Sequence, residues 1–263
     1  MSTPRTKSLG RAIELLREVA ARPQGTSASE LARATGVPRS TVARTLSTLS
    51  DAGLVEDADG WILGYELVRL ARAADPYRGF VDAAHGVLTR LRDDTGESAL
   101  LAVTHGRPGI EIVLQLDPPR HLGVASWVGV DVPLHASAAG KVALAELERD
   151  ELEAWFVRHP LVQFTQSTTT DAQALSAELA RVRKRRSAEL VDELEDGLTS
   201  LATAVRSADG SLVAMVGISA PTFRLGRTRR RELLPRLQSA ASELEATPPF
   251  SSQRSIIRSF ASE

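Results

Sequence analysis

The sequence predicts an α+β fold, with a winged helix-turn-helix at the N-terminal end and a second domain built on an antiparallel sheet. Three observations carry this prediction. Between Ser27 and Leu54, end signals mark two short amphipathic helices. A hairpin pattern with an Asp-Gly turn follows them directly. Beyond Ser98, strand-like apolar runs alternate with helical patterns.

The two helices of the first motif are placed by their ends. Ser27 and Glu30 form a Ser-x-x-Glu capping box, which opens the first helix. Gly36 suits the left-handed backbone that ends it, and Pro38 suits the first turn of the next helix. Along that second helix, the spacing i, i+4, i+7 predicts one buried stripe of Val42, Leu46 and Leu49.

The opposite side of this second helix carries hydrogen-bond donors. Arginine, serine and threonine are the residue types that reach base edges and phosphates. We therefore expect the helix to enter the major groove of double-stranded operator DNA. The candidate contacts are Arg39, Ser40, Thr41 and Arg44, with Ser47 and Thr48 further along. A plain helical hairpin is the alternative interpretation.

Composition and charge limit the class of protein. The chain has 263 residues, 43% hydrophobic and 25% charged, as in ordinary globular proteins of one or two domains. It has no cysteine, no apolar run near the ~18 residues of a membrane span, and no signal-peptide core in its first residues. We expect a cytoplasmic protein with no membrane association. Residues 1–50 carry a net charge of +5 within a total of −1, which is typical of a basic binding module on an acidic body.

The N-terminal part is expected to consist of three helices and a hairpin. A helix over Ser8–Ala21 precedes the motif, and a further helix follows Gly64, with a domain junction near Asp75–Phe80. The hairpin is expected to pair Leu54–Glu56 with Trp61–Leu63. The first helix should bury an apolar face of Leu9, Ala12, Ile13, Leu16 and Val19.

The remaining chain is expected to form the second domain, after a helix that ends near Gly96. The expected strands are Ser98–Thr104, Ile110–Leu116, Leu122–Val128, Leu201–Arg206 and Leu212–Ser219. The expected helices are Ala138–Leu147, Glu151–Val157, one opened by a capping box of Thr170 and Gln173, and Thr228–Glu245. The Ser-rich residues 248–263 are expected to fray.

Other chemistry finds little support in the sequence. Gly140 and Lys141 do not belong to a phosphate-binding loop. That motif needs Gly where His135 stands and Ser or Thr where Val142 stands. The five histidines show no metal-ligand spacing, and no Gly-x-Ser-x-Gly elbow occurs, so we expect no metal, no cofactor and no catalytic residues. The acidic residues 192–196 are interpreted as a solvated turn or helix. The basic run 181–186 and the arginines at 227 and 229–231 are interpreted as solvated faces, and the tryptophans as core or interface anchors.

Two sequence stretches occur together in a recognisable order. SLGRAIELL and its continuation through ELARATGVPRSTVARTLSTLSDAGLVE stand at the N-terminal end. The second stretch lies further along the chain. It consists of PLHASAAGKVALA (Pro133–Ala145), then Glu193, Gly197 and SLATAVRSADGSLVAMVGISAPTFR. Over residues 6–246 the chain resembles the IclR family of bacterial transcriptional regulators. The resemblance implies a homodimer or homotetramer that carries a GAF-like effector-binding domain for a small molecule, often an organic or aromatic acid. The expected boundaries are 6–68 for the DNA-binding domain, 69–80 for a linker helix, 81–247 for the GAF-like domain and 248–263 for a flexible tail.

The family resemblance also implies an effector pocket. The amides of Ala138 and Ala139 match those that hold the effector carboxylate, and free N–H groups at a helix start do attract anions. Leu190 and Gly217 depart from a polar family pattern, which favours a larger or less polar effector than a small keto acid. The positions that match the pocket are Ala138, Ala139, Leu198, Ser200, Gly217, Ser219, His121, Val124 and Val132.

These observations predict a ligand-responsive, DNA-binding transcriptional regulator of a metabolic operon. Two alternatives stay open. One is an enzyme or metabolite-binding protein with a helical N-terminal appendage. Turnover of a substrate would indicate the enzyme, and binding without turnover would indicate the binding protein. The other is an architectural DNA-binding protein, for which no metabolite would raise the melting temperature.

Overall fold

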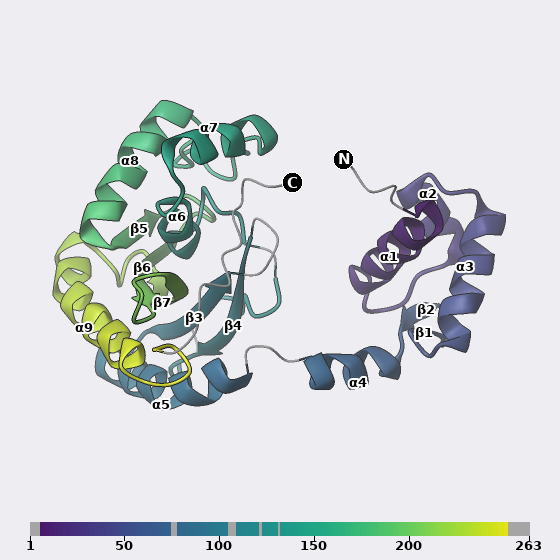
Figure 1. The fold of residues 1–263 in the computed structure, drawn as a ribbon, viewed down its shortest axis with the longest axis horizontal. Coiled ribbons are helices and arrows are strands. Elements are labelled where there is room, and N and C mark those ends of the chain that lie inside the picture. Colours follow the sequence, from purple (N-terminus) through teal and green to yellow (C-terminus); the bar gives the residue numbers. More distant parts are fainter. Residues whose placement is uncertain (1–5, 75–77, 105–108, 121–122, 131, 252–263) are drawn as a thin grey trace. The chain divides into compact units, whose positions relative to one another are not determined.

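The computed structural model describes residues 6–74, 78–104, 109–120, 123–130 and 132–251. The chain divides into two compact units, Met1–Pro76 and Tyr77–Glu263 (Figure 1). This division falls within the junction expected near Asp75–Phe80. Each unit has its own hydrophobic core.

The first unit is a helix-turn-helix with a short hairpin, as predicted. Its elements are α1 (Lys7–Ala20), α2 (Ala28–Thr35), α3 (Arg39–Asp51), β1 (Val55–Asp57), β2 (Trp61–Leu63) and α4 (Tyr65–Ala74). β1 and β2 pair antiparallel around a turn in which Asp59 has a φ of 57°. The core side chains are Leu15, Val19, Leu31, Val37, Val42, Leu46, Leu49 and Val55. The predicted stripe on α3 therefore faces this core.

The ends of α2 and α3 follow from local hydrogen bonds. The Glu30 amide donates to Ser27 Oγ at 3.2 Å, and the Ser27 amide donates to Glu30 Oε2 at 2.8 Å, so the predicted capping box is present. This amide holds the pKa of the Glu30 carboxyl below its ordinary value. Gly36 ends α2 with a φ of 68°. Pro38 is the N-cap of α3, one residue before its predicted place in the first turn.

The buried face of α1 differs from the prediction. Leu15 and Val19 are buried, but Leu9 is 62% exposed and Ile13 is 41% exposed. Ala12 and Leu16 pack at the edge of the core. The helix therefore carries apolar side chains on two sides, of which only one is covered within its own unit. α4 is similar, because Tyr65, Val68 and Leu70 are all exposed.

The second unit is a five-stranded antiparallel sheet with helices on both faces. Its helices are α5 (Arg78–Thr95), α6 (Ala138–Leu144), α7 (Arg149–Arg158), α8 (Ala172–Arg185) and α9 (Arg227–Glu245). Its strands are β3 (Ser98–Thr104), β4 (Ile110–Leu116), β5 (Ser187–Val191), β6 (Leu198–Arg206) and β7 (Leu212–Pro221). The strand order is β4-β3-β7-β6-β5, and every neighbouring pair is antiparallel.

Two hydrophobic cores lie on opposite faces of this sheet because successive strand residues point to opposite sides. In β3, Ala99 and Leu101 pack with α5 and α9, whereas Leu100 and Ala102 pack with α6 and α8. Figure 1 shows α5 and α9 on one side of the sheet and α6, α7 and α8 on the other. The α+β class and the antiparallel sheet are therefore confirmed.

Three local predictions for this unit were wrong, and one strand was not predicted. Residues 123–127 form no strand, and Val128 makes only an isolated bridge with Ile112. β5 was not predicted, because its sequence SAELV follows a basic run and is too short to show clear alternation. The N-cap of α8 is Asp171, whose carboxylate accepts from the Ala174 amide at 2.7 Å, in place of a capping box from Thr170. Phe250, expected in a frayed tail, is buried with its ring centroid 4.6 Å from that of Phe80.

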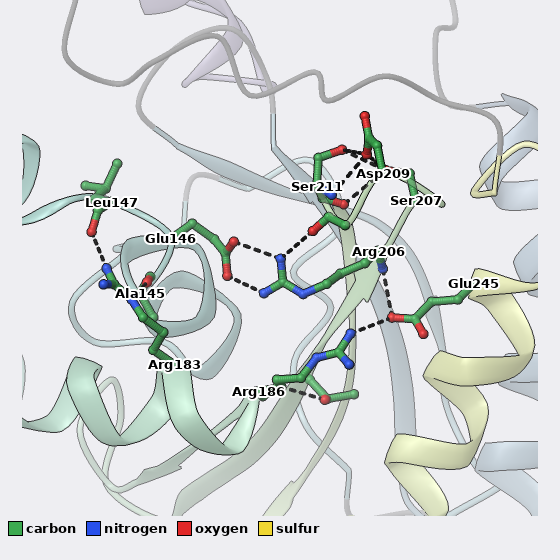
Figure 2. Close-up of polar contacts among 12 residues, drawn as sticks. Ala145, Glu146, Leu147, Arg183, Arg186, Arg206, Ser207, Asp209, Ser211 and Glu245 are labelled. Carbon is green, nitrogen blue, oxygen red and sulfur yellow. Dashed lines mark hydrogen bonds and ion pairs between the residues drawn. The ribbon is translucent and has the colours of Figure 1, made fainter.

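One arginine joins three parts of the second unit. Figure 2 shows the Arg206 guanidinium in a two-bonded pair with Glu146, at 2.6 and 2.9 Å. The same guanidinium donates to the carbonyl of Gly210, and the Arg206 amide donates to Glu245 at the end of α9. The β6–β7 turn beside it is ordered by Asp209, whose pKa falls to about 2 because the hydroxyls of Ser207 and Ser211 donate to it.

Candidate functional site

The outer side of α3 presents the predicted DNA contacts. Arg39, Ser40, Arg44, Ser47 and Thr48 are exposed, and Thr41 is half-buried. Thr48 Oγ1 donates to the Arg44 carbonyl at 3.1 Å, so its hydroxyl is engaged within the helix. Ser40, Arg44 and Ser47 form one polar face opposite the buried stripe, whereas Arg39 is exposed at the start of the helix. A face of this kind suits contacts with phosphates and base edges.

A cavity lies in the second unit between one face of the sheet and the start of α6. The cavity itself has a volume of about 40 Å³, and the hollow around it measures about 440 Å³ when open solvent is included. Of the predicted effector residues, it is lined by Ala138, Ala139, Val132, Leu198, Ser200 and Ser219. Leu190, named from the sequence as a departure from the family's polar pattern, also lines it. The sequence reasoning missed the other lining residues, which are Leu100, Ile110, Ile112, Trp127, Ser137, Leu194, Leu201 and Ala202. For the residues on β3, β4 and β6, alternation along each strand was the available signal, but using it required the order of the strands in the sheet.

The polar groups of this cavity are few and neutral. Ser200 Oγ lies 2.7 Å from Ser219 Oγ across the β6–β7 pair. Ser137 caps α6 by accepting from the Gly140 amide at 3.1 Å, while Lys141 makes the first intrahelical bond to the Ser137 carbonyl. The amides of Ala138 and Ala139 lie in the first turn of α6, before that bond, and so have no acceptor within the helix. Among the described lining residues none is charged.

Two predicted effector residues, Gly217 and Val124, do not line this cavity, and a third is not described by the structure. Gly217 is covered by Leu100, because a Cβ at position 217 would lie 2.8 Å from Leu100 Cδ1 and 2.9 Å from the Leu201 carbonyl oxygen. Val124 is partly buried and packs against the adjoining core. His121 lies outside the described residues. Leu100 thus takes the space that a side chain at position 217 would need.

A buried ion group involves α6, the helix whose start lines the cavity. The Lys141 side chain is fully buried, and its Nζ lies 2.6 Å from Glu193 Oε1 and 2.8 Å from Glu178 Oε1. Glu193 itself is only 8% exposed, so the interpretation of its segment as a solvated turn was wrong at this residue. The second oxygen of Glu193 has no hydrogen-bond partner among the described residues. These bonds tie α6 to α8 and to the turn that precedes β6.

Both units of the chain match models of known protein domains. The domain described as "Bacterial transcriptional regulator IclR C-terminal" matches residues 78–246, and "IclR helix-turn-helix domain" matches residues 8–59. The chain belongs to the IclR family. This confirms the predicted resemblance, and it makes the chain a helix-turn-helix transcriptional regulator.

Individual IclR relatives align along most of the chain. The HTH-type transcriptional regulator Rv1719 of Mycobacterium tuberculosis is 34% identical over 90% of this chain and 91% of its own length. A transcriptional regulator from Rhodococcus sp. RHA1 is 30% identical with a TM-score of 0.75, covering 92% of this chain and 97% of that structure. The inducer-binding domain of an Acinetobacter PobR double mutant, solved with 3-hydroxybenzoic acid, is 25% identical with a TM-score of 0.58 and covers 62% of this chain and 96% of its own.

No helix in the described ranges is long and apolar enough to cross a membrane. Within the same residues, His, Asp and Glu side chains form no group of three that would hold a metal ion.

Proposed function

We propose that this regulator binds operator DNA through α3 and responds to a small organic acid held in the cavity of the second unit. The observation that carries the proposal is the cavity itself, which opens on one face of the sheet and ends at the first amides of α6. Its lining combines apolar side chains with a few serine hydroxyls, which is how small-molecule sites are commonly built. A weakly polar ligand that fills it would stabilise the second unit.

The effector is proposed to be a monocarboxylate with an aromatic or larger apolar body. The amides of Ala138 and Ala139 would bind the carboxylate, and Ser200 or Ser219 would bond a second polar group. Leu100, Leu190 and Trp127 would contact the body of the ligand. The 3-hydroxybenzoic acid bound to the PobR domain belongs to this chemical class. Val124 and His121 stay proposed as outer contacts, and Gly217 as the residue that lets Leu100 approach.

The DNA-binding unit is proposed to act as a homodimer, alone or within a homotetramer. Exposed apolar residues support this on two elements of the first unit, with Leu9 and Ile13 on α1 and Tyr65, Val68 and Leu70 on α4. A second copy would cover them. Two copies of α3 would then read two half-sites of an operator.

The two units are proposed to communicate by a shift between two conformations with different half-site spacing. A ligand can drive such a shift only if it binds the two conformations with different affinity. We keep 6–68 as the DNA-binding domain, 69–80 as the linker and 81–247 as the effector domain. The residues of α4 and the start of α5 would carry the signal between them.

No catalytic role is proposed for the cavity, and the regulator is proposed to act in the cytoplasm, where operator DNA lies. Serine needs a neighbouring base to act as a nucleophile. Here Ser200 and Ser219 bond each other, and Ser137 bonds a backbone amide. Binding without turnover is therefore the expected behaviour, as for a sensor domain.

A thermal-shift comparison tests the ligand class. We expect 3-hydroxybenzoate to raise the melting temperature of the full chain more than pyruvate or glyoxylate at equal concentration. A matched variant, Ser219→Ala, should reduce that shift without lowering the melting temperature of the free protein greatly. Stabilisation by the keto acids alone would contradict the proposed effector class.

A further inference from the structure

The second unit carries a basic groove on the side of the molecule formed by α8, β5 and the start of α9. Five arginines line it, which are Arg181, Arg185, Arg227, Arg230 and Arg231. We call this the arginine groove. It has about 1130 Å³ of space, including open solvent, and it shares no lining residue with the cavity described above. Figure 1 shows α8 and α9 along the same edge of the second unit.

Two helix faces bring these arginines together. Glu178, Arg181, Val182 and Arg185 follow the spacing i, i+3, i+4, i+7 along one face of α8. Arg227, Arg230, Arg231 and Leu234 repeat that spacing on α9. Positive charge therefore lines both helical walls of one hollow. Like charges placed this way repel each other unless an anion lies between them.

The acidic residues of the groove are already engaged. Glu178 binds the buried Lys141 at 2.8 Å, and Glu189 binds Arg230 Nε at 2.7 Å. Arg230 also donates to the Leu225 carbonyl at 2.9 Å, which fixes it at the base of the groove. In the described parts of the chain, Arg181, Arg185, Arg227 and Arg231 have no ion-pair or side-chain hydrogen-bond partner.

The position of the α9 arginines adds to the positive potential. Arg227, Arg229 and Arg230 lie in the first turn of α9, where the helix dipole disfavours cations and favours anions. Gly226, the N-cap, supplies no side-chain acceptor for the free amides of that turn. These arginines therefore weaken the isolated helix end, and a bound anion would offset that effect.

We propose that the arginine groove is a second ligand site, which binds a small anion with several phosphate groups. Guanidinium groups pair with phosphate oxygens through two parallel bonds, so several arginines on facing walls suit a chain of phosphates better than a single carboxylate. The concave shape favours a small molecule over the convex backbone of duplex DNA. This site is separate from the effector cavity and does not depend on the ligand proposed there.

The test is isothermal titration calorimetry of the full chain with inorganic tripolyphosphate, at low and at moderate salt. Arg181→Gln/Arg227→Gln is the test variant, because both side chains are exposed and unpartnered and so should not disturb folding. Lys184→Gln/Arg120→Gln is the matched control, since it removes the same charge from exposed residues outside the groove. Orthophosphate is titrated as the single-phosphate comparison.

We expect tripolyphosphate to bind more tightly than orthophosphate, and the groove variant to lose about tenfold or more in affinity. The control should stay within about twofold, and the groove variant should keep its operator affinity. Equal affinity of the two variants, or no binding of tripolyphosphate, would overturn the proposal. So would a groove variant that loses affinity for duplex DNA but not for tripolyphosphate.

Discussion

The buried ammonium of Lys141 lies 2.6 Å from Glu193 Oε1, and this bond connects α6 to the turn before β6. The start of α6 lines the cavity, and so does Leu198 at the start of β6. The pair therefore holds two walls of the cavity at a fixed separation. It does so at an electrostatic cost, since one cation meets two carboxylates in a poorly solvated place.

Replacing Lys141 with methionine should destabilise the second unit strongly. The variant keeps much of the side-chain volume but leaves Glu178 and Glu193 without their cation. Removal of one partner from a buried ion pair typically costs about 3–5 kcal/mol. Urea denaturation at neutral pH measures the change. Lys184→Met, at an exposed position on α8, should change the free energy of unfolding by less than about 0.5 kcal/mol. Similar values for the two variants would show that the buried pair contributes little.

The same carboxylate predicts a pH dependence. Burial raises the pKa of Glu193 above its ordinary value of 4.5, although Lys141 partly opposes that rise. The folded state therefore binds a proton at the Glu193 carboxylate more tightly than the unfolded state does. The resulting stability is fully present below pH 4.5 and is lost as the pH rises through the raised folded pKa. Glu193→Gln cannot titrate, so its free energy of unfolding should fall less over that range. Parallel pH profiles of the two proteins would exclude this origin.

The contact between Leu100 and Gly217 predicts a volume limit. Gly217→Ser places a side chain within 3 Å of Leu100 Cδ1 and the Leu201 carbonyl, so it should cost about 1–3 kcal/mol. Adding Leu100→Ala should recover part of that loss, because it frees the space. The double variant should also bind small polar keto acids better than the parent chain. Strictly additive losses in a double-mutant cycle would contradict the proposed contact.

Arg44 tests the proposed DNA contact. If it reads a guanine, Arg44→Ala should cost about 1–3 kcal/mol at one base step and relax the preference for that base. Arg149→Ala, an exposed arginine of the second unit, is the control and should leave operator affinity unchanged. Unchanged affinity of Arg44→Ala at low and moderate salt would remove this residue from the site.

Sequence patterns predicted the first unit well because its signals are local. The Ser27–Glu30 capping box, the Gly36 stop and the Val42–Leu46–Leu49 stripe each depend on residues a few positions apart. The exposed Leu9 and Ile13 were misplaced because α1 has apolar residues on two sides, and periodicity alone does not say which side the core takes.

The second unit was predicted less completely because its site depends on distant strands. Ser200 and Ser219 were named, but their hydrogen bond requires the pairing of β6 with β7. Leu100 covers Gly217 only because β3 pairs with β7. Glu193 was expected in solvent, since its buried partner Lys141 lies 52 residues away. These contacts follow from tertiary pairing, which short-range patterns do not contain.

A gel-shift titration tests the central claim most directly, with DNA from upstream of the gene and its neighbours, at fixed salt and with excess competitor DNA. We expect a saturable shift that resists the competitor, is weakened by Arg44→Ala and changes when 3-hydroxybenzoate or a related acid is added. A folded protein that shows only competitor-sensitive binding, with or without such acids, would contradict the proposal that α3 and the cavity together form a ligand-responsive operator switch.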